Sequence, residues 1–223
     1  RRVLFRSVSI GTGATEGGGR RMSEIGKLIT LEGVDGAGKS THIELIAERL
    51  RSQGRNVLVT REPGGTPLAE KLRELVLNEP MDALAETLLI FAGRADHVRE
   101  LIRPALEAGS WVVCDRFSDA TIAYQGAGKG VRLELIQQLA EATHPGLRPD
   151  RTLVFDCSYD VARQRLNATG RRLDRFERED RQFFERVRGA YIARATAEPG
   201  RIRLIDASTS LSDIQRKLED NLL

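Results

Sequence analysis

The feature that most constrains the fold is the glycine-rich segment 33–40, Gly-Val-Asp-Gly-Ala-Gly-Lys-Ser. It matches the phosphate-binding pattern G-x-x-x-x-G-K-[ST] at every defined position. An apolar run of strand type precedes it at 27–32, and residues 41–50 follow with apolar side chains at helical spacing. Because strand, loop and helix are all present, a glycine-rich turn with a chance Lys-Ser is the weaker interpretation. The motif predicts binding of a nucleotide phosphate but leaves the reaction open.

Each part of this loop has a physical task. Glycines let the backbone turn so that N–H groups point inward and surround phosphate oxygens. The helix that begins near Lys39 adds the positive end of its dipole. We expect Lys39 to reach the β- and γ-phosphates and the Ser40 hydroxyl to bind Mg²⁺. The residues predicted to hold the nucleotide phosphates are Gly33, Val34, Asp35, Gly36, Ala37, Gly38, Lys39, Ser40 and Thr41.

Strand-like and helix-like segments alternate along the chain. The predicted strands are 27–32, 56–60, 111–115, 152–156 and 201–206. The predicted helices are 41–50, 68–77, one or two within 81–108, 116–125, 131–142, two charged stretches flanking 163–181, and 211–222, with a flexible loop at 126–130. This order predicts an α/β, three-layer P-loop NTPase fold: a five-stranded parallel sheet with helices on both faces. Ligands then bind at the carboxyl ends of the strands.

The first 21 residues differ in composition from the rest. They hold five glycines, five arginines and one glutamate, without sustained periodicity, and Met22 then opens a stretch that reads like an ordinary N-terminus. We interpret residues 1–21 as a disordered, vector-derived or upstream leader and 22–223 as one folded domain. The leader contributes +4 to the net charge of +3, which leaves −1 for the domain. The basic balance therefore does not indicate nucleic-acid binding.

Other features narrow the class of protein. No apolar run approaches the roughly 20 residues of a membrane-spanning helix. The two cysteines, Cys114 and Cys157, each end an apolar run, so we expect buried, reduced thiols in a cytoplasmic protein. The histidines His42, His97 and His144 lack metal-ligand spacing, and we expect them at surface or helix positions. No Ser-His-Asp or paired-carboxylate arrangement indicates a hydrolase.

Polar residues follow other predicted strands besides the first. Segment 61–66 follows the second strand, Asp115 and Arg116 end the third, and a loop follows Asp156 at the end of the fourth. An aspartate at a strand end near a phosphate loop can hold Mg²⁺ directly or through water, so Ser40 and Asp115 are the predicted metal ligands. Arg116 can grip an acceptor phosphate with its planar guanidinium. The alternative, a helix-capping aspartate beside a surface arginine, is weakened by the nearby phosphate loop.

Residues 26 to about 222 resemble bacterial thymidylate kinases, which are P-loop nucleoside monophosphate kinases. The resemblance rests on segments 33–40, 60–66 (TREPGGT), 91–94 (FAGR), 115–117 (DRF) with 123–126 (AYQG), and 173–177 (LDRFE). The phosphate loop is shared by a large superfamily, whereas the REPGGT and YQG contexts are far more specific. The resemblance implies transfer of the ATP γ-phosphoryl to dTMP, giving ADP and dTDP for dTTP synthesis, with Mg²⁺. It also implies a homodimer formed through the helices around 82–108 and 131–142.

The resemblance assigns roles in the acceptor site as well. Arg73 and Arg116 would grip the acceptor phosphate, and Asp35 would face the sugar and its 3′-hydroxyl. Arg94 would donate to the thymine ring. The other implied dTMP contacts are Glu62 beside the acceptor, Thr121 and Gln125 at the base edge, Tyr124 where the 2′-hydroxyl is absent, and Phe91.

The chain departs from many relatives at two positions, one before Arg94 and one in the loop after Gln125. Their base-stacking phenylalanine lies four residues before the base-reading arginine, where this chain has Ile90. Phe91 lies three before, and both positions neighbour Arg94 on a helix, so Phe91 could still stack on the base. The alternative is that Phe91 is a core aromatic residue. Lys129 replaces a common arginine, which keeps the charge but loses the bidentate fork.

The arginine-rich segment 163–181 is similar to the short lid of these kinases. An arginine must offset charge on the transferred phosphoryl group. Some relatives carry it in the phosphate loop, where this chain has Gly36 and Ala37, so we predict that the lid supplies it. The predicted catalytic residues are Lys39, Asp35, Arg116 and the lid candidates Arg171, Arg172 and Arg175.

Two other functions remain open at this point. One is a kinase of the same fold for another nucleotide or a small acid, which acceptor profiling would distinguish. The other is a P-loop GTPase switch or nucleotide-dependent binding module, but the chain lacks the guanine-reading Asn-Lys-x-Asp stretch. The expected partners are ATP and dTMP, with no nucleic acid and no membrane.

Overall fold

The computed structural model describes residues 25–222, so the interpretation of residues 1–21 lies outside it. Five parallel strands form one sheet in the order β2-β3-β1-β4-β5. Their bounds are β1 Leu28–Gly33, β2 Val57–Arg61, β3 Trp111–Asp115, β4 Arg151–Asp156 and β5 Ile202–Asp206. All five strands were predicted, with bounds that differ by at most one residue.

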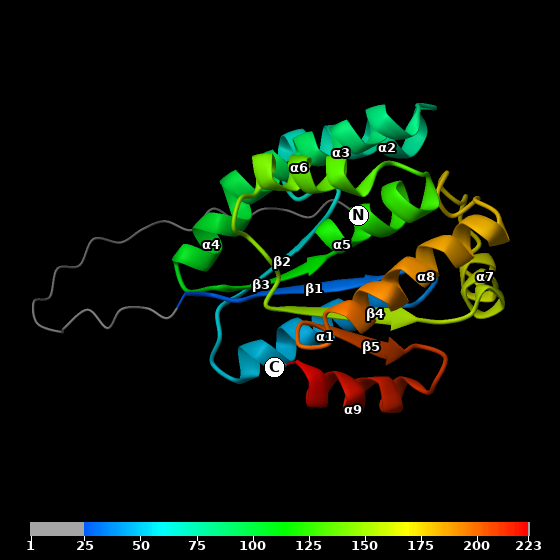
Figure 1. Ribbon diagram of the computed structural model, residues 1–223. Coiled ribbons are helices and arrows are strands. Elements are labelled where there is room, and N and C mark those ends of the chain that lie inside the picture. The colour runs from blue at the N-terminus through cyan, green and yellow to red at the C-terminus, as the bar shows by residue number, and fades with distance from the viewer. Residues whose placement is uncertain (1–24, 223) are drawn as a thin grey trace, which may run out of the picture.

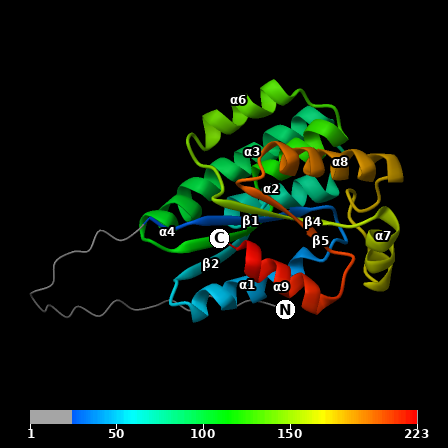
Figure 2. The ribbon, with the colours of Figure 1, turned by 60° about the horizontal axis from the view of Figure 1, so that its bottom comes forward.

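Helices cover both faces of the sheet (Figure 1). α1 (Lys39–Ser52) and α9 (Leu211–Asn221) lie on one face. The helices over or beside the other face are α2 (Pro67–Asn78), α3 (Ala83–His97), α4 (Arg103–Glu107), α5 (Ser118–Thr121), α6 (Leu133–Thr143) and α8 (Arg181–Ala197). Two π-helical segments, η1 (Val98–Ile102) and η2 (Ile122–Gly128), continue α3 and α5. α7 (Tyr159–Ala168) lies beyond the carboxyl ends of the strands (Figure 2). The three-layer α/β fold is confirmed.

Strand β1 occupies the centre of the sheet, and all six of its residues are therefore buried. It pairs with β3 on one side and β4 on the other, with Leu31 opposite Asp115 and Gly33 opposite Phe155. Such two-sided burial requires the near-continuous apolar run seen in the sequence. The register brings the phosphate loop and the Asp115–Arg116 corner to the same edge of the sheet.

One prediction is wrong at this corner. Residues 116–125 were expected to be helical throughout, but α5 begins only at Ser118. Arg116 has a left-handed backbone with φ 70°, and the Phe117 N–H donates to the buried Glu32 carboxylate at 2.7 Å. These two features turn the chain sharply before the helix can start.

The loop expected at 126–130 is also partly wrong. Residues up to Gly128 continue the helix as η2, which packs along α8. A Cβ at Gly128 would lie 2.6 Å from the Phe183 ring, so the glycine permits close packing here instead of flexibility.

Candidate functional site

The phosphate loop lies between β1 and the start of α1. Gly33 has φ 127°, and a Cβ there would lie 2.3 Å from the Phe155 carbonyl oxygen of β4, so only glycine fits. Lys39 is buried, and its Nζ donates to the carbonyls of Gly33 and Val34 at 3.0 Å each. The loop forms the floor of a cavity of about 1800 Å³ that is also lined by Asp115, Arg165 and Arg171.

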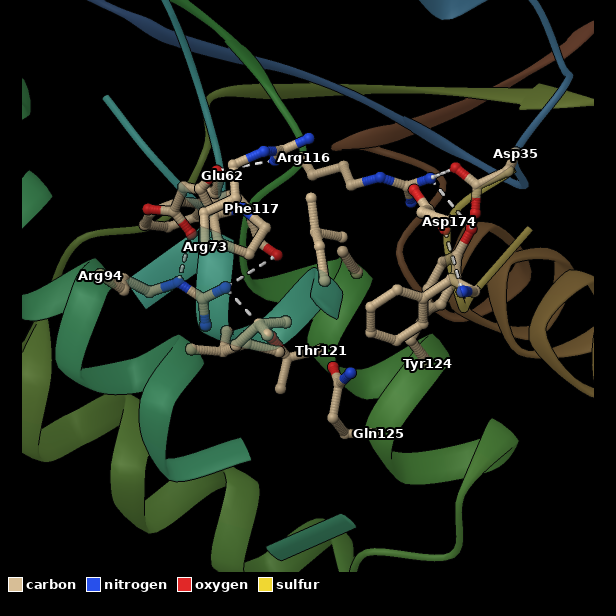
Figure 3. Close-up of a pocket in the computed structure, with 16 residues that line it drawn as sticks. Asp35, Glu62, Arg73, Arg94, Arg116, Phe117, Thr121, Tyr124, Gln125 and Asp174 are labelled. Atoms are coloured by element: carbon tan, nitrogen blue, oxygen red, sulfur yellow. Dashed lines mark hydrogen bonds and ion pairs between the residues drawn. The ribbon is translucent and has the colours of Figure 1, made fainter. Parts of the chain in front are cut away.

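A second, smaller cavity of about 590 Å³ opens beside the first (Figure 3). Its walls come from the loop after β2, from α2, α3, α5 and η2, and from the lid. The lining side chains that were predicted to contact dTMP are Glu62, Arg73, Arg94, Arg116, Thr121, Tyr124 and Gln125. Asp35, predicted to face the sugar, lines it as well, so eight of the nine residues assigned to the acceptor site surround one cavity.

The two cavities share one wall. Its residues are Asp35, Glu62, Arg73, Leu77, Arg116 and Asp174. Arg116 is central, because its guanidinium donates to the Gly33 carbonyl at 3.0 Å and to Asp35 at 2.6 Å. Its Nη2 also donates to the Tyr124 hydroxyl at 2.9 Å. A cation thus lies where a ligand in one cavity would meet a ligand in the other.

Asp35 connects the phosphate loop to the wall that the two cavities share. Its second oxygen accepts from the Tyr124 hydroxyl at 2.8 Å. Burial opposes ionisation of this carboxyl, but the charges of Arg116 and Lys39 outweigh it and lower the pKa of Asp35. The left-handed backbone of Arg116 is uncommon for a residue with a side chain, and such strain concentrates at functional sites.

Arg94 reaches the cavity from α3 and has one donor to spare. Its Nε donates to Glu62 at 2.6 Å, and its Nη2 donates to the Phe117 carbonyl at 3.2 Å and to Thr121 at 3.0 Å (Figure 3). The buried Nη1 has no partner. An unpaired buried donor is costly, so this atom indicates a site for an acceptor atom of a ligand.

Gln125 is oriented by a buried carboxylate. Its Nε2 donates to Glu86 at 2.7 Å, which leaves the amide oxygen as an acceptor at the cavity. Glu86 is fully buried and also binds Lys129 at 2.8 Å. Arg94 and Gln125 thus supply a donor and an acceptor at this end of the cavity.

Of the two interpretations of Phe91, the structure favours the core aromatic residue. Phe91 is 2% exposed and does not line the cavity, whereas Ile90 and Phe117 do. The Phe91 ring lies under the Arg94 guanidinium at 4.8 Å and stacks on His144. This ring therefore belongs to the core and not to the cavity lining.

The three lid arginines lie in different places. Arg171 pairs with Glu177 and lines the phosphate-loop cavity. Arg172 is exposed and lines neither cavity. Arg175 pairs with Glu86, the carboxylate that also binds Gln125, and it does not line the phosphate-loop cavity. The placement therefore favours Arg171 among the three candidates. Arg165 of α7 is a further candidate, because it lines the same cavity and donates to the Ala37 carbonyl at 3.3 Å.

The predicted metal ligands face the phosphate-loop cavity. Ser40 and Asp115 both line it, and the buried Oδ1 of Asp115 has no hydrogen-bond partner. A carboxylate oxygen and a hydroxyl are the hard ligands that Mg²⁺ prefers, so these residues fit the ion. Within residues 25–222 no group of three or more His, Cys, Asp or Glu side chains has metal-binding geometry. A metal here would take further ligands from phosphate or water.

The three histidines occupy helical or helix-end positions, as predicted, but none lies at the surface. His42, His97 and His144 are all buried. Burial lowers the pKa of His144 to about 4, so this ring is neutral at pH 7. Spacing alone gave no sign of this, because their partners are distant in the chain. Cys114 and Cys157 are buried free thiols, as predicted.

Glu32 is a buried carboxyl behind the site that the sequence did not single out. It is fully buried at the end of β1, where it accepts from the Phe117 N–H and, at 2.8 Å, from the Tyr191 hydroxyl. Burial and the charge of Asp119 raise its pKa from 4.5 to about 8. The available signal was a lone acidic residue within an apolar central strand.

Glu32 is expected to make stability fall as pH rises. Between pH 4.5 and 8 the folded chain holds a proton on Glu32 that the unfolded chain releases, so this contribution is lost as pH rises through 8. Across this window the free energy of unfolding of wild type should fall relative to that of Glu32→Gln, by an amount on the order of a few kcal/mol. Urea unfolding from pH 4.5 to 9 measures it; parallel curves for the two proteins would contradict the assignment.

Comparison with known proteins identifies the family. The thymidylate kinase family profile matches residues 31–218. The chain belongs to the thymidylate kinase family. The thymidylate kinase of Bordetella pertussis is 56% identical over 201 residues, which cover 90% of this chain and 96% of that protein. That of Pseudomonas syringae pv. tomato is 55% identical over 87% of this chain and 93% of that protein.

A solved thymidylate kinase has the same fold. The crystal structure from Ehrlichia chaffeensis is 34% identical, with a TM-score of 0.72, covering 88% of this chain and 98% of that chain. As a thymidylate kinase, the protein phosphorylates dTMP to dTDP. The alternatives of a different acceptor or a GTPase switch are therefore set aside. Within the described residues no helix is long and apolar enough to cross a bilayer.

Proposed function

We propose that the two cavities are the donor and acceptor sites of this thymidylate kinase, which hold ATP and dTMP in line across their shared wall. Arg116 and Arg73 grip the acceptor phosphate, and Lys39 and the loop N–H groups hold the donor phosphates. The acceptor phosphate is a nucleophile at neutral pH, so the protein needs no strong general base. Alignment, charge neutralisation and exclusion of water supply the rate enhancement.

The observation that carries this proposal is the position of Arg116 in the shared wall. Its guanidinium contacts both the phosphate loop and the acceptor residue Tyr124. Arg116→Lys keeps the charge but loses the fork, so it should weaken dTMP binding and lower kcat at least about tenfold each. Titration calorimetry with dTMP and steady-state kinetics measure these effects. Unchanged dTMP affinity with normal kcat would refute this role.

Mg²⁺ fits the same arrangement. Ser40 and Asp115 would hold it, as the unpartnered Oδ1 of Asp115 supports. The ion would neutralise charge on the β- and γ-phosphates. Tyr124 and Asp35 then complete the acceptor site at the sugar, with the base between Arg94 and Gln125.

A homodimer is proposed to form through α3 and α6. These helices pack together and expose Leu84 (48%) and Leu88 (46%), one turn apart on α3, and Leu133 on α6. Leu88→Glu should convert the dimer to a monomer, because it places a charge within an apolar contact. Leu204→Glu on the edge strand β5, with a similarly exposed leucine, is the matched control. Sedimentation analysis that finds wild type monomeric at micromolar concentration would exclude the dimer.

We propose that residues 1–21 are separate from the kinase domain. The family profile begins at residue 31, and the match to the Bordetella protein leaves about a tenth of this chain uncovered. Removing residues 1–21 should leave kcat and Tm nearly unchanged, whereas a loss of several degrees would show that they pack on the domain.

The two free buried thiols support a reducing, cytoplasmic location, since cytosolic thiols stay reduced.

A further inference from the structure

His97 lies at the centre of a buried hydrogen-bond chain between β2 and α3. Its ring is fully buried, with Nδ1 3.0 Å from Glu62 Oε1 and Nε2 2.7 Å from Thr60 Oγ1. The other oxygen of Glu62 accepts from Arg94 Nε at 2.6 Å. His97 lines neither cavity, yet it is two hydrogen bonds from the guanidinium that does.

The charge of Glu62 determines which atom donates in its hydrogen bond with His97. Burial opposes ionisation of Glu62, but Arg94 and the hydrogen bond from His97 outweigh it and lower its pKa. An ionised carboxylate can only accept, so Nδ1 of His97 carries a proton and donates it to Glu62. The other ring nitrogen, Nε2, shares a hydrogen bond with the Thr60 hydroxyl at 2.7 Å. His97 thus fixes one oxygen of Glu62 and leaves the other directed at Arg94.

The same ring supports the loop 61–66 that lines the acceptor cavity. A Cβ at Gly65 would lie 2.4 Å from His97 Nε2 and 2.7 Å from Thr60 Oγ1, so the loop backbone rests directly on the ring. The loop also places the Pro63 carbonyl, which accepts from Arg73 Nη1 at 2.8 Å. His97 therefore supports two of the three arginines that line this cavity, Arg94 through Glu62 and Arg73 through the loop.

We propose that His97 is a positioning residue for acceptor selection. Through Glu62 it holds the Arg94 guanidinium so that Nε and Nη2 are occupied and Nη1 is left for the ring carbonyl of a pyrimidine acceptor. The inference rests on the proposed role of Arg94. Loss of the Nδ1 donor lets Glu62 and Arg94 reorient, and the preference for a carbonyl over an amino group at that place then weakens.

A matched pair of variants tests this step. Asparagine places its amide N–H near the position of Nδ1, whereas glutamine places its amide near Nε2, and both remove the ring. His97→Asn should keep the ratio of kcat/KM for dTMP over dCMP close to wild type. His97→Gln should lower that ratio at least about tenfold, mainly by raising the KM for dTMP, with the KM for ATP unchanged in both.

The outcomes separate a positioning role from packing and from failure of the site assignment. An unchanged ratio in His97→Gln, or equal changes in the KM for ATP, would show that the ring only fills space and would overturn the inference. Arg94→Lys is measured in parallel. If it leaves the ratio unchanged, the proposed role of Arg94 fails and this inference with it. If it lowers the ratio while His97→Gln does not, only this inference fails.

Should both His97 variants fail to fold, the wild-type protein carries the test. The chain has three histidines, so ¹⁵N-histidine spectra can be assigned with variants of His42 and His144. We expect His97 as the Nδ1–H tautomer, with ring signals that shift when dTMP binds but not when ATP binds. An Nε2–H tautomer, or signals indifferent to dTMP, would overturn the proposal.

Discussion

Replacing Arg171 by alanine is expected to lower kcat by about 10³, because an arginine that offsets charge on a transferred phosphoryl group supplies an effect of this size. The phosphate loop has no arginine, and Arg171 is the lid candidate that lines its cavity. Arg171 is held by Glu177, so it must exchange this partner for the phosphoryl group during turnover. The KM for dTMP should change far less than kcat.

Two neighbours are controls for this experiment. Arg172→Ala removes an adjacent, exposed arginine that lines neither cavity and should leave kcat nearly unchanged. Arg165→Ala removes the second arginine at the phosphate loop. Single-turnover kinetics at saturating ATP and dTMP isolate the transfer step. A near-normal rate for Arg171→Ala with a large loss for Arg165→Ala would move the role from the lid to α7.

The second large effect is expected in the choice of acceptor base. Arg94 Nη1 is an unpaired donor, and the Gln125 amide oxygen is an acceptor because Nε2 is bound to Glu86. Thymine offers a carbonyl oxygen and a ring N–H to this pair, whereas cytosine offers an amino group and a bare ring nitrogen. The resulting mismatch in a buried site should cost several kcal/mol, or about 10²–10⁴ in kcat/KM.

The expected order of acceptors is dTMP, dUMP, dCMP, and then GMP and AMP. dUMP lacks only a methyl group, so its penalty should be smaller, roughly 10–200-fold. Purines are larger than pyrimidines, so they should not fit between the same two groups without movement of α3 and η2. Initial rates with five acceptors at fixed ATP and Mg²⁺ measure the order. A dCMP rate close to that of dTMP would show that Arg94 and Gln125 do not read the base edge.

Local patterns predicted most of the fold because the elements depend on nearby residues. The five strands followed from apolar runs, and the phosphate loop from its spacing. The acceptor residues came from a resemblance, and they converge because their elements meet at one edge of the sheet. The role of Phe91 stayed open at the sequence level, because spacing cannot distinguish two adjacent helical positions.

Buried polar partners could not be predicted in this way. Glu32 and His97 bind residues 85 and 35 positions away, so no local pattern contains both members of either pair. The break before α5 depends on the same long-range contact, since the Phe117 N–H binds Glu32 instead of continuing a helix. Arg175 was grouped with Arg171 by composition, and only its pairing with Glu86 separates the two.

The shared wall has a consequence for inhibitor design. Ligands in the two cavities would be separated only by side chains such as Asp35 and Arg116, so a single molecule with two head groups can span both. Once one head group is bound, the other is presented at high effective concentration, and the linked compound should exceed either half in affinity by about 10²–10⁴. Resistance would be difficult to acquire at this wall, because a substitution of Asp35 or Arg116 that disturbs the inhibitor also disturbs donor and acceptor together.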